Sequence, residues 1–291
     1  MLTIKKIKDR IRKVKERIRK FFGIRLLKSI RDLIIFQQNA EFQRKRLNPL
    51  NSYGKKCFSQ NDEDGITLEI IKRLGVKKGV FAEFGPGNGL ENNTICLAAL
   101  KWKGFWAGSE DLKFKYNNSK NFHFFKEWIT KENVLNIFNE GIKNLNEKKV
   151  DVLSLDLDGN DIYILEELIK NIKHPSLIIA EYNAKFPPPI KFKIKYEPKF
   201  IWRGDDYFGA SLSELADVLK KYSYELVCCN SHTGSNAFFI KNDFIELFKE
   251  VPKDIEKIYI EPHYQLYERY GHPQSIKTIE VIFEELENQI N

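Results

Sequence analysis

The sequence predicts an α/β protein in which a mainly parallel sheet of seven strands carries helices on both faces. Three observations indicate this class. Short apolar runs that suit buried strands alternate with stretches of helical length along the body of the chain. Glycines or acidic residues follow several of these runs, as expected for strands whose carboxyl ends carry a ligand site. The 291 residues, 42% of them hydrophobic, suffice for one such domain with extensions.

Composition and charge exclude several classes of protein. No apolar run is long enough for a membrane-spanning helix, and the charged N-terminus lacks the apolar core of a signal peptide. The four cysteines show no Cys-x-x-Cys spacing, which argues against a zinc ribbon or a dense disulfide scaffold. A reducing cytoplasm is the expected compartment. Residues 1–22 carry the entire formal charge of +8, so the body is neutral and no nucleic-acid surface is expected.

Residues 1–22 predict a basic amphipathic helix. Apolar residues recur every three or four positions and form a narrow stripe on one face. In a parallel coiled-coil dimer, Lys8 and Arg10 would occupy facing e and g positions and repel their counterparts. An anionic membrane surface, with the protein peripheral at its inner face, or an acidic partner suits the pattern better. A solvated helix that packs lightly on its own domain is the alternative. The stripe consists of Ile4, Ile7, Ile11, Val14, Ile18 and Phe21.

The chain is expected to have three parts. Gly23 should interrupt the first helix, and a second amphipathic stretch runs from residue 24 to about residue 46. A cluster of helix-breaking residues over 48–54 then marks a boundary. The predicted parts are a basic helical extension over residues 1–50, an α/β domain over 51–248 and a helical appendage over 249–291.

Helices and strands alternate through the body. Residues 61–64 can cap a helix that ends at Gly75. The expected helices cover residues 65–74, 91–102, 131–145, 162–171 and 211–221. The expected strands cover residues 80–84, 105–108, 123–129, 150–155, 176–180, 224–229 and 237–240. Ligands of such sheets bind at the carboxyl ends of the strands.

A glycine-rich turn follows the first expected strand, in the stretch Glu-Phe-Gly-Pro-Gly-Asn-Gly over residues 83–89. Glycine permits a tight turn and close approach of a ligand, and the next helix offers free N–H groups. A P-loop would need Gly-Lys-Ser/Thr, which is missing, and Leu90 stands where the dinucleotide fingerprint has its third glycine. The remaining pattern, Glu-x-Gly-x-Gly-x-Gly, resembles the first motif of class I S-adenosylmethionine-dependent methyltransferases, which have a Rossmann-like fold.

This resemblance implies a cofactor site along the strand ends. Glu83 would attract the amino group of the methionine moiety. Either Glu110 or Asp111 lies at the distance expected for an acid that binds ribose, and Trp128 and Ile129 would contact adenine. An ordinary glycine turn, solvated acids and core side chains are the structural alternatives. The residues implied for the cofactor are Glu83, Gly85, Gly87, Gly89, Glu110, Asp111, Trp128, Ile129 and Asp156.

An acidic segment follows the fourth strand, where residues 155–161 read Leu-Asp-Leu-Asp-Gly-Asn-Asp. Three carboxylates so close together repel unless a cation, hydrogen-bond donors or water compensates them. Glu181 and Asn183 follow the fifth strand, and adjacent strands would bring both sets to one rim. Such oxygen ligands suit Mg²⁺, Mn²⁺ or Ca²⁺, which could lower the pKa of a substrate hydroxyl. Asp156, Asp158, Glu181 and Asn183 are the candidate metal ligands.

The layout resembles the metal site of catechol-type O-methyltransferases, and Asp-x-Asp-Gly-x-Asp resembles FkbM-type methyltransferases over about residues 58–245. That resemblance implies methylation of a hydroxyl on a glycan, a lipid-linked sugar or a secondary metabolite. Asp158 is the first candidate for the catalytic base, and His232 is the second. Asp158 or Asp161 could instead cap the next helix. Two other functions stay open: a glycosyltransferase that uses residues 156–158 to bind a nucleotide sugar through a metal, and a degenerate module that recruits partners.

The long connection over residues 184–204 is the expected substrate lid. It holds three consecutive prolines and interleaves basic with aromatic residues. Long connections in compact domains are often functional, aromatic rings stack on sugars, and basic side chains attract phosphate or uronate groups. A structural flap of the same composition is the alternative.

Overall fold

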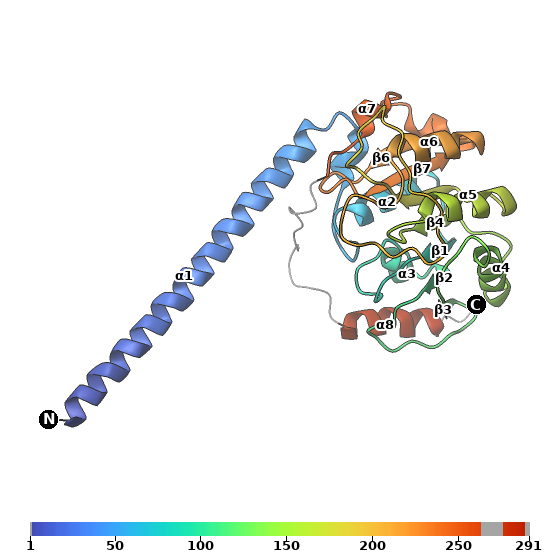
Figure 1. The fold of residues 1–291 in the computed structure, drawn as a ribbon. Coiled ribbons are helices and arrows are strands. Elements are labelled where there is room, and N and C mark those ends of the chain that lie inside the picture. The colour runs from blue at the N-terminus through green and yellow to red at the C-terminus, as the bar shows by residue number, and fades with distance from the viewer. Residues whose placement is uncertain (1, 263–275, 289–291) are drawn as a thin grey trace. The chain divides into compact units, whose positions relative to one another are not determined.

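A computed structural model describes residues 2–262 and 276–288 of the chain (Figure 1). The chain divides into two units, Met1–Lys45 and Arg46–Asn291. The parts of the expected appendage at 263–275 and 289–291 lie outside the described residues. Within the described ranges, no helix combines the length and apolarity needed to cross a membrane.

The first unit is a single helix, α1 (Leu2–Lys45). The expected interruption at Gly23 is therefore wrong, because the helix continues through this residue. A glycine inside a helix costs about 1 kcal/mol relative to alanine, which is too little to end a helix with this many residues on each side. The two amphipathic stretches of the sequence are two halves of one helix.

The second unit is built on a seven-stranded sheet of order β3-β2-β1-β4-β5-β7-β6. Neighbouring strands are parallel except for β7, which is antiparallel to both β5 and β6. This arrangement confirms the predicted Rossmann-like, mainly parallel sheet. The strands are β1 (Val80–Phe84), β2 (Lys103–Gly108), β3 (Phe122–Lys126), β4 (Val152–Leu155), β5 (Leu177–Glu181), β6 (Tyr224–Cys229) and β7 (Asn236–Lys241).

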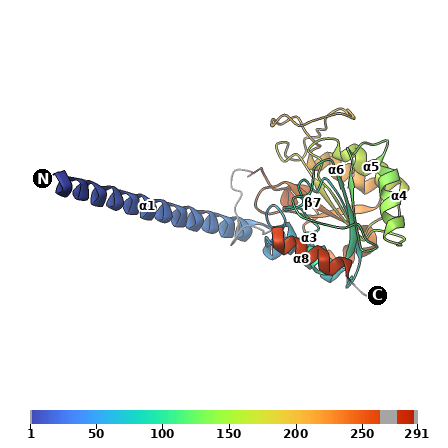
Figure 2. The ribbon, with the colours of Figure 1, turned by 90° about the horizontal axis from the view of Figure 1, so that it is seen from below.

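Helices cover both faces of this sheet, as predicted. Figure 2 shows α4, α5 and α6 on one face and α3 and α8 on the other. The α-helices are α2 (Glu63–Arg73), α3 (Ile95–Ala99), α4 (Val134–Asn144), α5 (Asp161–Asn171), α6 (Leu212–Lys221), α7 (Ile255–Ile258) and α8 (Ile276–Glu287). The described residues also include two 3-10 helices, η1 (Pro49–Tyr53) and η2 (Asn242–Phe248).

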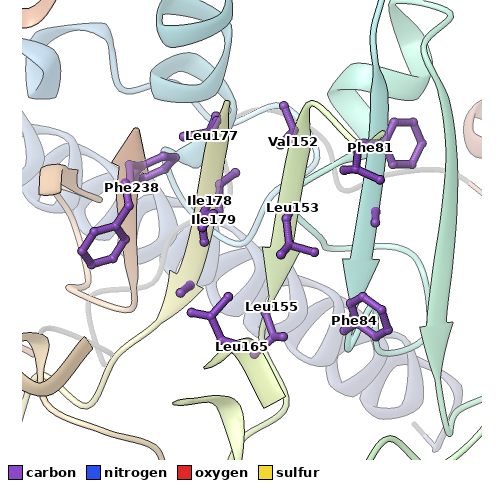
Figure 3. Close-up of a cluster of buried hydrophobic side chains, with 14 of the residues drawn as sticks. Phe81, Phe84, Val152, Leu153, Leu155, Leu165, Leu177, Ile178, Ile179 and Phe238 are labelled. Carbon is purple, nitrogen blue, oxygen red and sulfur yellow. The ribbon is translucent and has the colours of Figure 1, made fainter. Parts of the chain in front are cut away.

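The core lies between the central strands and the helices. Figure 3 shows side chains of β1, β4 and β5 in one apolar cluster, with Leu165 of α5 against them. The C-terminal helix α8 belongs to the same core, because the ring of Phe283 lies 4.4 Å from that of Phe122 and 5.1 Å from that of Trp106. The segment after α1 is also anchored: the side-chain amide of Asn48 donates to the carbonyl of Val227 in β6 (2.6 Å).

The topology brings the expected site segments together. The carboxyl ends of the parallel strands β1, β2, β3 and β4 lie at one edge of the sheet. The loop between β6 and β7 reaches the same edge, because β7 runs antiparallel to β5 and Asn236 pairs with Glu181. The glycine-rich turn, the acidic segment and the β6–β7 loop therefore share one rim.

Candidate active site

A cavity of about 300 Å³ lies at this rim. Its walls come from the turn after β1, the end of β2, the segment after β3, the acidic segment after β4 and residues 200–202 of the long connection. Cavities of this size at the carboxyl edge of an α/β sheet are typical of small-molecule sites. The segments that the sequence indicated one by one as parts of a site therefore line the same cavity.

The glycine turn forms one wall. Gly85 and Gly87 both line the cavity and have φ of +89° and +53°, in the left-handed region that favours glycine. A Cβ on Gly85 would lie 1.6 Å from the carbonyl oxygen of Asp156, whereas nothing in the described chain lies within 4 Å of a Cβ on Gly87. Gly89 faces the protein instead, since its Cβ would contact Phe114. The turn therefore packs tightly on the acidic segment at Gly85 and leaves open space at Gly87.

Glu83 lies beneath the turn and does not line the cavity. Its Oε1 accepts a hydrogen bond from the backbone N–H of Asn93 (2.9 Å), and its Oε2 accepts from the side chains of Asn92 (3.0 Å) and Thr94 (2.5 Å). These bonds hold residues 92–94 in a loop, so α3 begins at Ile95. The helix expected over 91–102 is therefore wrong in its first turn, and it is also wrong at its end, because α3 stops at Ala99. Burial raises the pKa of Glu83 to about 7.

Glu83 and a second buried acid should make the unfolding free energy depend on pH. Burial and the adjacent Asp62 raise the pKa of Glu63 to about 7 as well, from an ordinary value of 4.5. The folded protein therefore holds both protons more tightly than the unfolded chain. We expect the unfolding free energy to fall as pH rises from about 4.5 to about 7, by up to about 3 kcal/mol for each group.

Urea unfolding at about pH 5 and pH 7.5 measures this effect. Glu63→Gln should make the pH dependence shallower, because the proton that Glu63 takes up is lost while the other buried acids still take up theirs. The matched change of an exposed acid, Glu256→Gln, should leave the dependence as it is in the unchanged protein. The same pH dependence in all three proteins would contradict the expected role of Glu63.

The structure separates the two acids that could bind ribose. Glu110 lines the cavity, whereas Asp111 points outward and pairs with Lys126 at 2.6 Å. Trp128 and Ile129 also line the cavity. Ile129 is buried, and Trp128 is 45% exposed with its ring fixed by a hydrogen bond from Nε1 to the carbonyl of Pro198 (2.7 Å). The cavity is therefore lined by the carboxylates of Glu110, Asp156 and Asp158 and by the apolar side chains of Trp128 and Ile129.

Three acids form a cluster beside the glycine turn. One carboxylate oxygen each from Asp156, Asp158 and Glu181 lies within 4.8 Å of the others. Burial, and then the charge of the neighbouring acids, raises the pKa of Asp156 and of Glu181 well above their usual range. Within the described part of the chain, the buried Oε2 of Glu181 has no hydrogen-bond partner. Carboxylates that repel, with one oxygen unsatisfied, fit a divalent cation such as Mg²⁺ or Mn²⁺.

The acidic segment is held by its own last acid. Asp161 accepts hydrogen bonds from the backbone N–H groups of Leu157 (2.7 Å) and Gly159 (2.9 Å). Asp158, between them, has φ of +54°, a conformation that costs energy for a residue with a side chain. Asp161 therefore stabilises the strained loop that places Asp158 at the cavity. This role goes beyond capping the next helix, the alternative that the sequence left open.

Asn183 and His232 lie apart from this cluster. The side-chain amide of Asn183 donates to the carbonyls of Asp206 and Phe208, both at 2.9 Å, and its oxygen accepts from the N–H of Lys185. These bonds engage the side chain in anchoring the long connection. His232 is buried in the β6–β7 loop and does not line the cavity.

Sequence reasoning missed the residues that close the site. Asn160 clamps the long connection over the cavity: its Nδ2 donates to the carbonyl of Glu197 (2.7 Å), and its Oδ1 accepts from the N–H of Glu197 (3.3 Å). Residues 200–202 then form part of the cavity wall. No local pattern marks a partner 37 positions away, so only the folded chain reveals this clamp.

Comparison with family models gives no match, and comparison with curated protein sequences gives none either. Among solved structures, the chain is similar to a candidate hemolysin from Lactococcus lactis, at TM-score 0.42 and 10% identity over 66% of this chain and 92% of that one. It is similar to a precorrin-6y C5,15-methyltransferase from Geobacter metallireducens GS-15, at TM-score 0.35 and 11% identity over 65% and 92% of the two chains. It is also similar to an O-methyltransferase family 2 protein from Planctomyces limnophilus DSM 3776 in complex with apigenin, at TM-score 0.33 and 8% identity over 72% and 61%. Similarities of this size do not define a function, which has to come from the side chains of this chain.

Proposed function

We propose that the protein is an S-adenosylmethionine-dependent O-methyltransferase of the FkbM type. Its substrate would be a hydroxyl of a sugar, a glycan or a lipid-linked sugar precursor, and a divalent ion, Mg²⁺ or Mn²⁺, would assist. The supporting observation is the single cavity that joins the glycine turn to Glu110 and to the acids Asp156 and Asp158. A nucleoside-binding wall next to a cation-binding cluster suits the transfer of a group from a nucleoside to an oxygen.

The cavity walls fit the nucleoside. Gly85 and Gly87 leave the backbone accessible, Glu110 can accept hydrogen bonds from ribose hydroxyls, and Ile129 and Trp128 offer an apolar surface to a planar base. S-adenosylmethionine supplies a methyl group on a positively charged sulfur, which is already a good leaving group. The protein then has to orient the acceptor oxygen, and such positioning contributes much of the rate.

Asp158 is the proposed base. Asp158 lines the cavity, and burial, and then Glu110, raises the pKa of its carboxyl while no ion is bound. A bound ion would oppose this shift, so the proposal rests on the position of Asp158 in the cavity. Asp158 would accept the proton of the acceptor hydroxyl as the methyl group is transferred to the oxygen and the sulfur keeps the electron pair of the broken carbon–sulfur bond. Asp158 would also be one of the residues that hold the ion. Asp156 and Glu181 would be the remaining ion ligands, and the bound ion would lower the pKa of the hydroxyl.

Calorimetry with S-adenosylhomocysteine, with and without Mn²⁺, tests the proposal. We expect the folded protein to bind it, and we expect Glu110→Ala to weaken binding about tenfold or more, because a charge-assisted hydrogen bond to ribose is lost. Asp111→Ala is the matched control, since this neighbouring acid lies outside the cavity. A folded protein that binds no S-adenosylhomocysteine would refute the proposal. Binding of UDP alone would favour a glycosyltransferase.

A further inference from the structure

The helix α1 carries apolar surface that nothing in its own unit covers. The large apolar side chains between Ile11 and Phe36 whose exposure the structure describes are between 44% and 67% exposed. A helix of 44 residues is about 66 Å long, so this surface is extended and narrow. Contiguous apolar surface of this extent marks an interaction site.

Most of the apolar side chains of α1 beyond Gly23 lie off the face that the first half presents, although Phe36 returns to it. At about 100° per residue, Ile11, Val14, Ile18 and Phe21 fall on one stripe. Leu27 and Ile34, beyond Gly23, fall on roughly the opposite side of the same helix. A flat partner that contacts the first stripe would therefore leave Leu27 and Ile34 facing away. The first stripe is named the front stripe below.

Charge defines what can cover the front stripe. Residues 2–45 hold fifteen basic and four acidic side chains, a net charge of +11, while the whole chain has +8. The basic residues Arg10, Lys15 and Arg17 lie along the two edges of the front stripe. A second copy of the helix would bring positive charge against positive charge in either orientation. The charge beside the stripe therefore favours an anionic partner.

We propose that the front stripe of α1 binds lengthwise to the anionic surface of a lipid bilayer. An apolar stripe bordered by basic residues on both edges is suited to a planar surface, where the apolar side chains enter between the headgroups and the basic ones contact lipid phosphates. Each basic side chain near such a surface contributes about 1 kcal/mol, and the attraction weakens with salt. The helix would then lie along the surface of the bilayer, in the interface.

Sedimentation of the full chain with vesicles tests this proposal. We expect binding to vesicles that contain phosphatidylserine at low salt, little binding to pure phosphatidylcholine, and release at high salt. The change of Arg10, Lys15 and Arg17 to Gln should weaken binding roughly a hundredfold. Val14→Ser with Ile18→Ser should weaken it about tenfold or more, because two apolar side chains no longer enter the interface.

Leu27→Ser with Ile34→Ser is the matched control, since it removes two apolar side chains from the opposite side of the same helix. It should change vesicle binding by less than about twofold. Circular dichroism checks that every variant keeps its helix, and binding of S-adenosylhomocysteine checks the second unit. The proposal is overturned if the full chain does not bind phosphatidylserine vesicles, or if the two serine pairs weaken binding equally. It is also overturned if light scattering shows a dimer lost with the front stripe, or if polyglutamate binds more tightly than vesicles.

Discussion

Asp156→Asn is expected to reduce the affinity for Mn²⁺ at least a hundredfold, because loss of even an outer-shell partner of a metal ligand costs 10- to 100-fold. Without metal, the same change should raise the melting temperature. Asp156 is one of three clustered acids whose carboxylates repel, and burial adds to the unfavourable energy of its charge. The variant should therefore be more stable than the unchanged protein in EDTA and gain no stability when Mn²⁺ is added.

Melting temperatures with EDTA and with excess Mn²⁺ measure both effects. A ligand that binds the folded state raises the melting temperature, so the unchanged protein should show a Mn²⁺-dependent increase. Asp111→Asn, an exposed acid outside the cluster, is the control and should behave like the unchanged protein. If Asp156→Asn keeps the full Mn²⁺-dependent increase, the cluster does not bind the ion in the way proposed.

Gly85→Ala is expected to destabilise the second unit by about 3 kcal/mol or more. The new Cβ would lie 1.6 Å from the carbonyl oxygen of Asp156, and the backbone at φ +89° is unfavourable for alanine. The carbonyl of Asp156 belongs to the backbone and cannot rotate away as a flexible side chain can. The ends of β1 and β4 would therefore have to separate. Urea unfolding measures the loss.

Gly87→Ala is the matched control for the turn. Its φ of +53° imposes a cost of about 1 kcal/mol, but nothing in the described chain lies within 4 Å of the new Cβ. This variant should fold and bind S-adenosylhomocysteine more weakly, because the added methyl group enters the cavity wall. If Gly85→Ala destabilises no more than Gly87→Ala, the tight packing of the turn on Asp156 does not matter for stability.

The strands could be predicted because their apolar runs are buried on both faces of the sheet, so local composition carries the signal. The rim could be predicted as well, since parallel strands place their carboxyl ends together. The start of α3 could not be predicted. It depends on hydrogen bonds from residues 92–94 to the buried carboxylate of Glu83, and the periodicity of apolar residues does not reveal such bonds. The continuity of α1 through Gly23 could not either, since a single glycine weakens a helix without ending it.

The residues of the candidate site also fall into those whose position could be predicted from the sequence and those whose position could not. Asp156, Asp158 and Glu181 follow strands that prove to be neighbours, so their proximity follows from the sheet. Asn183 follows the same strand as Glu181, yet its amide binds carbonyls more than twenty residues away. Asn160 likewise binds a distant segment. The hydrogen-bond partners of polar residues in loops depend on the tertiary fold. The spacing of residues along the chain does not reveal them.

The contact between Gly85 and the carbonyl of Asp156 has a thermodynamic consequence. Since these two segments touch through their backbones, a ligand that orders one of them also restricts the other, and the second ligand then has less conformational entropy to remove. Nucleoside and divalent ion should therefore each increase the affinity for the other, by the same factor in both directions.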